Sequence, residues 1–196
     1  AIADHVGPVY LRFGRPKVPV FTNPNQKFEI GKGIKLIEGN DVTIVATGHL
    51  VWESIEAAKI LNQSGISAEV INIHTIKPLD EKIILKSVSK TKCIVSAEEH
   101  NYLGGLGESI SRVLSKNMPL PQEFVATKDT FGESGTPAQL MKKYGLNSDS
   151  IVEIVKKVIN RKYSNRLLML YHQDLNSLEF RRHLYHHLSD HHHRYR

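Results

Sequence analysis

The stretch DVTIVATGHLVWESIEAAKILNQSGISAEVINI, residues 41–73, decides the fold class. Its two ends are apolar, β-branched runs, 42–47 and 68–73, with the length and composition of buried strands. Between them, apolar residues recur at helical spacing from Leu50 to Leu61, and Gly65 stands where the end of a helix favours glycine. A strand, a helix and a strand joined by short connections predict a βαβ crossover with parallel strands.

The same alternation continues on both sides of this stretch. Upstream, residues 35–37 are apolar, and Gly39-Asn40-Asp41 predicts a hairpin turn that adds one antiparallel strand. Downstream, we expect strands at 93–97 and 124–126, and helices after Asp80 and at 104–115, 137–144 and 148–160. The chain is therefore predicted to be a three-layer α/β/α sandwich, with a mostly parallel sheet of about five strands and one antiparallel strand.

Changes in composition divide the chain into four segments. Residues 1–15 include Val9–Phe13, a β-branched and aromatic run that predicts a strand. Residues 16–33 hold Pro16, Pro19 and Pro24 and are interpreted as an extended linker. The sandwich domain is predicted to span 34–162. Residues 163–196 hold seven of the eleven histidines and are expected to be a disordered or non-native tail, in which 167–171 could form a short apolar helix.

Composition narrows the class of protein. The hydrophobic fraction of 40% and the charged fraction of 23% are those of an average globular protein. The net charge of +6 comes from scattered lysines and arginines without interleaved aromatics, which disfavours nucleic acid as a partner. No run approaches the roughly 20 apolar residues of a membrane span. The first residues resemble no signal peptide, and the chain begins without Met, almost inside a strand pattern, as if cut from a longer one.

The single cysteine, Cys93, is expected to be a buried thiol, and we expect a cytoplasmic protein.

Two groups of residues follow predicted strands. Gly104-Gly105-Leu106-Gly107 opens a helix but lacks the third glycine and the downstream acidic residue of a dinucleotide site, so close packing of helix on sheet is favoured over phosphate binding. Glu98 and His100 point to the same side of an extended strand and could share a proton or a metal ion, although a structural or interface role is favoured because no second ligand pair has metal spacing.

Other candidates are single residues. His49 is expected to cap a helix or lie on the surface, and His74 is isolated. Ser134 lies outside any G-x-S-x-G elbow, so Ser134 or Thr136 is expected to cap a helix that begins at Pro137.

Arg12 is the candidate with two open interpretations. It lies in the predicted strand, on the face opposite its apolar neighbours and next to Gly14. It could bind a phosphate or carboxylate with its guanidinium, or form an interdomain salt bridge.

Five of these segments, in this order, resemble the C-terminal portion of transketolases, and the wording is closest to the shorter, split transketolases. They are GPVYLRFGR (7–15), DVTIVATG (41–48), VINIHTIKPLD (70–80), EEHNYLGGLGE (98–108) and FGESGTPAQLMKKYGL (131–146).

The resemblance implies a fold, an activity and one site residue. Residues 1–15 would be the last strand of the upstream pyrimidine-binding domain, and 34–162 the transketolase C-terminal domain. The complete enzyme would transfer a two-carbon ketol unit between sugar phosphates, using thiamine diphosphate and Mg²⁺ held by upstream domains or an N-terminal subunit, as a homodimer or heterotetramer. Arg12 occupies the position of an arginine that binds the substrate phosphate. No catalytic, cofactor-binding or metal-binding residue is expected in this chain, which alone would be inactive.

Three alternatives remain. The chain could be the corresponding domain of a 2-keto-acid dehydrogenase β subunit or of a deoxyxylulose-phosphate synthase, or a non-catalytic oligomerisation or binding module that uses the same fold.

Overall fold

A computed structural model describes residues 1–14 and 17–164 of the 196-residue chain. The chain forms two compact units, 1–159 and 160–196. Of the second unit only residues 160–164 are described, and they are helical. The expected helix at 167–171 and nearly all of the histidine-rich tail lie outside the described residues.

The first unit is built on one five-stranded sheet with the strand order β1-β3-β2-β4-β5. The strands are β1 (Ile34–Ile37), β2 (Val42–Ala46), β3 (Ala68–Asn72), β4 (Ile94–Asn101) and β5 (Gln122–Thr127). Strand β2 pairs in parallel with both β3 and β4, and β4 pairs in parallel with β5. Strand β1 is antiparallel to its neighbour, so the predicted mostly parallel sheet with one antiparallel strand is confirmed.

The hairpin predicted at Gly39-Asn40-Asp41 is wrong, because β1 pairs with β3 and not with β2. The turn has another role. The amides of Asn40 and Asp41 both donate to the carbonyl oxygen of Ser67, and a Cβ on Gly39 would lie 2.2 Å from the backbone of Ala68. The turn residues therefore pack against the start of β3. Strand β1 pairs with the side of β3 that faces away from β2.

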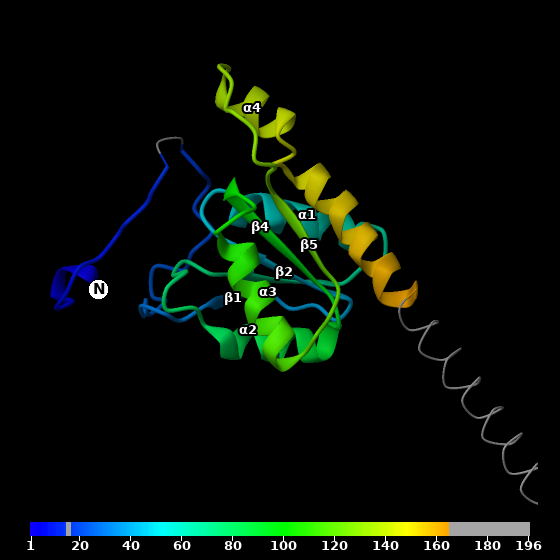
Figure 1. Cartoon of the computed structure of the whole chain (residues 1–196), viewed down its shortest axis with the longest axis horizontal. Helices are drawn as coiled ribbons and strands as arrows, with labels where there is room; N and C mark the ends of the chain where they lie inside the picture. The colour runs from blue at the N-terminus through cyan, green and yellow to red at the C-terminus, as the bar shows by residue number, and fades with distance from the viewer. Residues whose placement is uncertain (15–16, 165–196) are drawn as a thin grey trace, which may run out of the picture. The chain divides into compact units, whose positions relative to one another are not determined.

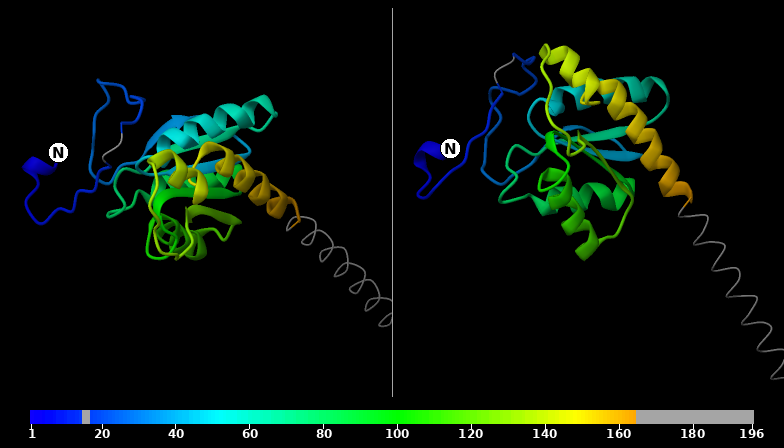
Figure 2. Two further views of the ribbon diagram at one scale, coloured as in Figure 1. Left: turned by 90° about the horizontal axis from the view of Figure 1, so that it is seen from above. Right: turned by 45° about the horizontal axis from the view of Figure 1, so that its top comes forward.

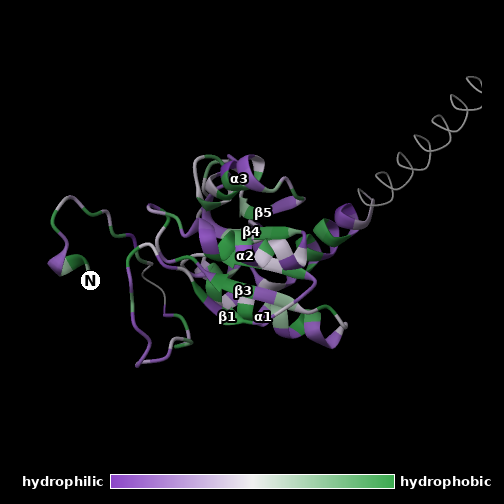
Figure 3. Cartoon of the chain, turned by 90° about the horizontal axis from the view of Figure 1, so that it is seen from below, coloured by the Kyte–Doolittle hydropathy of each residue, from purple (hydrophilic) through white to green (hydrophobic). Residues whose placement is uncertain are grey.

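Helices cover both faces of the sheet, as Figures 1 and 2 show. One face carries α1 (Leu50–Gln63) and the helix that begins at residue 148, and the other carries α2 (Glu81–Thr91) and α3 (Leu106–Asn117). Neighbouring residues of β2 alternate between the two cores, because successive side chains of a strand point to opposite faces: Ile44 packs with α1 and Val45 with α2 and α3. Figure 3 shows hydrophobic strands between helices whose outer faces are polar. The predicted three-layer sandwich is confirmed.

Local features of the sequence correctly predicted where three of the helices begin or end. Asp80 accepts the amide of Ile83 at 3.3 Å at the start of α2, and its other oxygen accepts the amide of Gly33 at 3.0 Å. Helix α1 ends before Gly65, whose φ of 77° is the left-handed value that favours glycine. Thr136 forms a capping box with Gln139 at the start of α4 (Pro137–Lys143).

The predicted strand at Val9–Phe13 is not formed. In the described part of the chain these residues have no strand partner, and backbone groups form a ladder only when a neighbouring strand supplies donors and acceptors. They are extended and exposed, with Phe13 at 82% exposure. Residues 17–33, in the predicted linker, contain no helix or strand.

Candidate functional site

The candidate site lies at the carboxyl ends of β2 and β4, the edge where parallel α/β sheets place their ligands. Three segments meet there: Arg12 and Gly14 from the N-terminal segment, His49 at the start of α1, and Glu99 near the end of β4. The contacts span up to 87 residues of sequence, and no local pattern would have indicated them.

Arg12 is held by a neutral acceptor. One guanidinium nitrogen, Nη2, donates to the backbone carbonyl oxygen of Glu99 at 3.0 Å. No ion pair joins Arg12 to a carboxylate within residues 1–14 and 17–164. The Arg12 side chain is exposed, so its positive charge and most of its N–H donors face solvent, where they can bind an anion.

The carboxylate of Glu99 points to a different partner. Its Oε2 lies 2.9 Å from Nδ1 of His49, and the His49 side chain is 17% exposed. A Cβ on Gly14 would lie 2.3 Å from Nε2 of His49, so the ring is packed against the backbone of residue 14. His49 is the N-cap residue of α1, which is one of the two positions expected for it, but its side chain makes no capping hydrogen bond.

Glu98 and His100 are not brought together. Glu98 is 1% exposed, and its two oxygens accept the amides of Leu106 and Gly107 at 2.8 Å each, at the start of α3. His100 is exposed, and its Nδ1 lies 2.9 Å from the carbonyl oxygen of Asn101. The pairing of β4 with β5 shifts register between Ala97 and Asn101, which breaks the alternation on which the proton-sharing or metal-sharing interpretation depended. The favoured structural role is confirmed for Glu98.

The glycines before α3 allow this close contact. A Cβ on Gly105 would lie 2.3 Å from a carboxylate oxygen of Glu98, and a Cβ on Gly107 would lie 2.3 Å from the ring of Phe124. Gly107 therefore lets the helix pack closely on β5, as predicted, while Gly105 leaves room for the capping carboxylate. The amides that a phosphate would need already bind Glu98.

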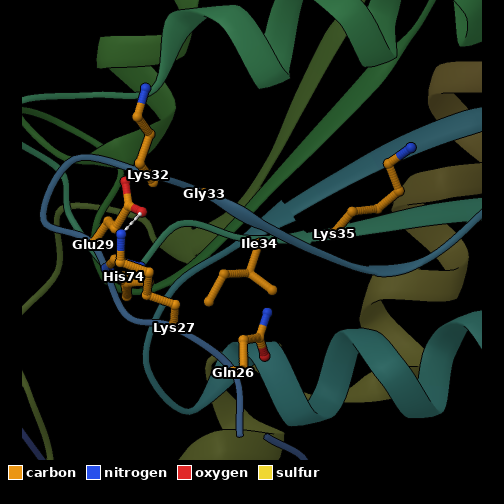
Figure 4. A pocket seen from close by; sticks show the side chains of 8 residues that line it. All are labelled: Gln26, Lys27, Glu29, Lys32, Gly33, Ile34, Lys35 and His74. Carbon is orange, nitrogen blue, oxygen red and sulfur yellow. Dashed lines mark ion pairs between the residues drawn. The ribbon is translucent and has the colours of Figure 1, made fainter. Parts of the chain in front are cut away.

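A hollow of about 330 Å³ lies apart from this site, between residues 26–35 and His74 (Figure 4). Two of its three lysines are paired with carboxylates: Lys27 lies 2.8 Å from Glu29, and Lys35 lies 2.8 Å from Glu38. Figure 4 shows the ammonium groups of Lys32 and Lys35 well apart, on either side of Ile34. The hollow therefore does not focus positive charge on one point.

The imidazole ring of His74 packs against an aromatic ring in this region. It lies 4.2 Å from Phe28 between ring centroids, and Nδ1 lies 2.8 Å from the hydroxyl of Thr75. Burial lowers the pKa of His74, and an opposing interaction with the Lys32 backbone raises it by less. Burial therefore stabilises the neutral form of this imidazole relative to the charged form.

Glu69 on β3 is a buried carboxylate that the sequence did not indicate. Burial alone would raise the pKa of Glu69, but hydrogen bonds from Lys90 and Ser87 and the nearby charge of Lys35 outweigh it, and the pKa lies below its usual value. Its Oε2 lies 2.5 Å from Nζ of Lys90 and 3.6 Å from Nζ of Lys35. Glu69 is thus a structural ion-pair residue at the β1–β3 edge.

Metal and membrane features are absent from the part of the chain that the structure describes. Within it, no three His, Cys, Asp or Glu side chains group closely enough to hold a metal ion. None of its helices is long and apolar enough to cross a membrane.

The sheet and its helices match a known family. The model of the family "Transketolase, C-terminal domain" matches residues 31–151, more than half of the chain. The chain belongs to this family. The transketolase C-terminal domain thus accounts for β1–β5, α1–α4 and the start of the last helix.

Relatives of this transketolase domain include subunits of split enzymes. The 6-deoxy-6-sulfo-D-fructose transketolase subunit SqwH of Clostridium sp. (strain MSTE9) is 43% identical over 161 residues, which are 82% of this chain and 50% of that protein. An apulose-4-phosphate transketolase subunit of Phocaeicola vulgatus is 36% identical over 161 residues, or 80% of this chain and 51% of that protein. The chain thus spans about half the length of these relatives.

A solved structure shares the fold. A split-gene transketolase, described as an inactive β4 tetramer, superposes with a TM-score of 0.72 at 43% identity, covering 74% of this chain and 48% of that one.

Proposed function

We propose that this chain is the C-terminal part of a transketolase, which transfers a two-carbon ketol unit between sugar phosphates when upstream domains or an N-terminal subunit complete it. The observation that carries this proposal is the exposed guanidinium of Arg12, anchored at the carboxyl edge of the sheet of a transketolase C-terminal domain. We assign Arg12 to the phosphate end of the sugar.

The substrates named for two relatives support this assignment. One relative is named for a sulfo-sugar and the other for a sugar phosphate, and both substrates carry an anionic group away from the carbonyl end. A guanidinium binds such groups through parallel N–H donors. Arg12 retains those donors because its anchor, the Glu99 carbonyl, uses one nitrogen and carries no net charge.

Within residues 1–14 and 17–164, no three His, Cys, Asp or Glu side chains lie close enough together to hold a metal ion. We propose that upstream domains or an N-terminal subunit hold thiamine diphosphate and Mg²⁺, in a homodimer or in a heterotetramer with an N-terminal subunit. We also propose a cytoplasmic enzyme, consistent with the buried thiol of Cys93.

Reconstitution tests this function. The chain is combined with an N-terminal transketolase subunit, thiamine diphosphate and Mg²⁺, and ketol transfer from xylulose 5-phosphate to ribose 5-phosphate is measured. The same mixture is offered pyruvate with glyceraldehyde 3-phosphate, which a deoxyxylulose-phosphate synthase would condense, and a 2-keto acid with a dehydrogenase acceptor. Transfer only in the first assay is expected. No transfer by a folded, assembled complex would favour the non-catalytic module.

Arg12→Ala tests the phosphate assignment in the same complex. The lost charge pair is expected to weaken binding of phosphorylated donors by about 2–4 kcal/mol, seen as a higher KM. Arg112→Ala is the control, because Arg112 is an exposed arginine of α3 that pairs only loosely with Glu81, at 3.4 Å. An equal loss with non-phosphorylated sugars would contradict the role of Arg12.

A further inference from the structure

We propose that residues 26–33 form a strap that His74 holds against the domain, and that protonation of His74 releases it. The strap is the last part of the linker and leads directly into β1. It contains no helix or strand, and residues 26–30 are exposed. Its position therefore depends on a few contacts with the loop that follows β3, and this inference does not depend on the proposed function.

An aromatic contact and a hydrogen bond join the strap to this loop. The ring of Phe28 lies 4.2 Å from the ring of His74 between centroids. The amide of Gly33 donates to Oδ2 of Asp80 at 3.0 Å. Among the side chains in these two contacts, the imidazole is the one whose ordinary pKa lies between about pH 5 and about pH 8. A change in pH within this range therefore acts on the strap through His74.

The closed strap leaves the His74 ring without an acceptor for a second proton. Nδ1 lies 2.8 Å from the hydroxyl of Thr75, and Nε2 is buried with no hydrogen-bond partner among the described residues. A neutral imidazole needs only one donor, but an imidazolium has an N–H on both nitrogens. A buried donor without an acceptor is costly. Protonation is therefore more favourable when the strap has moved aside and water reaches the ring.

The charged groups around the ring do not compensate for this cost. They are those that line the hollow with His74 and the carboxylate that binds Gly33: Lys27, Glu29, Lys32, Lys35 and Asp80. The Glu29 carboxylate is paired with Lys27 at 2.8 Å, and the Asp80 carboxylate accepts two backbone amides. Neither forms an ion pair with His74 within residues 1–14 and 17–164. An imidazolium at this position would lie among lysines without a carboxylate of its own.

The neighbouring ion pairs keep their charges over the same range of pH. The hydrogen bond and the charge of Lys27 hold the pKa of Glu29 below its ordinary value. Hydrogen bonds to Glu29 and Glu38 raise the pKa of Lys27 and of Lys35 above theirs. These groups therefore do not titrate between about pH 5.5 and about pH 7.5, and they cannot release the strap there.

The direction of the response follows from the closed state. Burial lowers the pKa of His74 in the closed strap, and the Lys32 backbone opposes this by less. A proton thus binds the open strap more tightly than the closed strap, and it shifts the equilibrium towards the open form as the pH falls. Because the strap connects residues 1–14 to β1 through the linker, its release loosens the connection between the N-terminal segment and the sheet.

Hydrogen exchange in the full chain tests this inference. The reporters are the amides of Lys32, which donates to the carbonyl oxygen of Glu29 at 3.1 Å, and of Gly33. Their protection is measured by NMR relative to an unstructured peptide of the same sequence at each pH. Between about pH 7.5 and about pH 5.5 we expect the protection of both amides in the wild type to fall about 3-fold or more.

Two substitutions separate the proton from the aromatic contact. His74→Phe keeps an aromatic ring but cannot be protonated, so protection should be equal at the two pH values. Phe28→Ala removes the contact itself, so protection should be low at both. His100→Phe is the control, because His100 is an exposed histidine outside the strap, and it should respond to pH as the wild type does.

The amide of Leu106 distinguishes release of the strap from unfolding of the domain. This amide donates to the buried carboxylate of Glu98 at 2.8 Å and should keep its protection in every variant. A fall at Leu106 as large as that at Gly33 would mean that the whole domain opens, which overturns the inference. Unchanged protection in the wild type, or an equal fall in His74→Phe, would overturn it as well.

Discussion

The buried carboxylate of Glu98 gives the sharpest test of how this domain is held together. Its two oxygens accept the amides of Leu106 and Gly107 at 2.8 Å each, and the side chain is 1% exposed. Glu98→Gln keeps the shape of the side chain but leaves one oxygen as an acceptor. The new NH₂ group then faces an amide that is also a donor, so one buried N–H loses its partner.

The cost can be worked from these contacts. A hydrogen bond to a charged group contributes about 1.5–3 kcal/mol, and an unsatisfied buried donor carries a penalty of similar size. The negative charge at the start of α3 contributes about 0.3–1 kcal/mol more through the helix dipole. Because these terms overlap, we expect Glu98→Gln to lower the free energy of unfolding by about 2–4 kcal/mol. For a domain of this size, the melting temperature should fall by about 4–16 °C.

Urea denaturation followed by far-UV circular dichroism measures this loss. The matched control is Glu108→Gln on the same helix, because Oε2 of Glu108 also accepts an amide, that of Gly104 at 2.8 Å, but at an exposed position. The control should lose less than about 1 kcal/mol, since water replaces an exposed partner. If Glu98→Gln lost no more than the control, the reasoning that this carboxylate is a buried cap would be refuted.

Three further predictions concern packing, capping and pH. Gly107→Ala should lower the free energy of unfolding by about 1–3 kcal/mol, because the added Cβ would lie 2.3 Å from the Phe124 ring, whereas Gly132→Ala, with open space around it, should change it by less than about 0.5 kcal/mol. Thr136→Ala should cost about 1 kcal/mol through the lost cap of α4, and Thr136→Ser should restore most of it; equal losses in both variants would contradict the capping role. Because burial lowers the pKa of His74 below 6.5, the stability present above that pH is lost as the pH falls toward the folded-state pKa. His74→Phe should therefore reduce the fall in melting temperature between about pH 7.5 and about pH 5.5, and an unchanged fall would show that other groups cause it.

Much of the fold could be predicted because the signals are local. The βαβ unit of residues 41–73 follows from two β-branched runs around a helical pattern, and the end of α1 follows from Gly65. Asp80 and Thr136 cap the helices expected of them, since a capping side chain reaches only two or three residues along the chain. The family motifs are likewise local strings of sequence, and the family match at residues 31–151 covers four of the five, all but the one at 7–15.

The tertiary structure alone decided which distant groups meet. The turn sequence Gly39-Asn40-Asp41 does not determine which strand pairs with the strand before it. In the structure that strand, β1, pairs with β3 and not with β2. The alternation rule for Glu98 and His100 failed because β4 shifts register against β5, a property of the pair of strands.

The candidate site depends on the same kind of information. Arg12 and Glu99 stand in two of the family motifs, but no motif states that they meet each other or His49, and only the packing of three segments brings them within hydrogen-bonding distance. The hydrophobic periodicity, the composition of each segment and the helix caps can be predicted from the sequence, because each involves residues within a few positions of each other. Contacts over as many as 87 residues depend on how the whole sheet and its helices pack, and only the folded domain determines them.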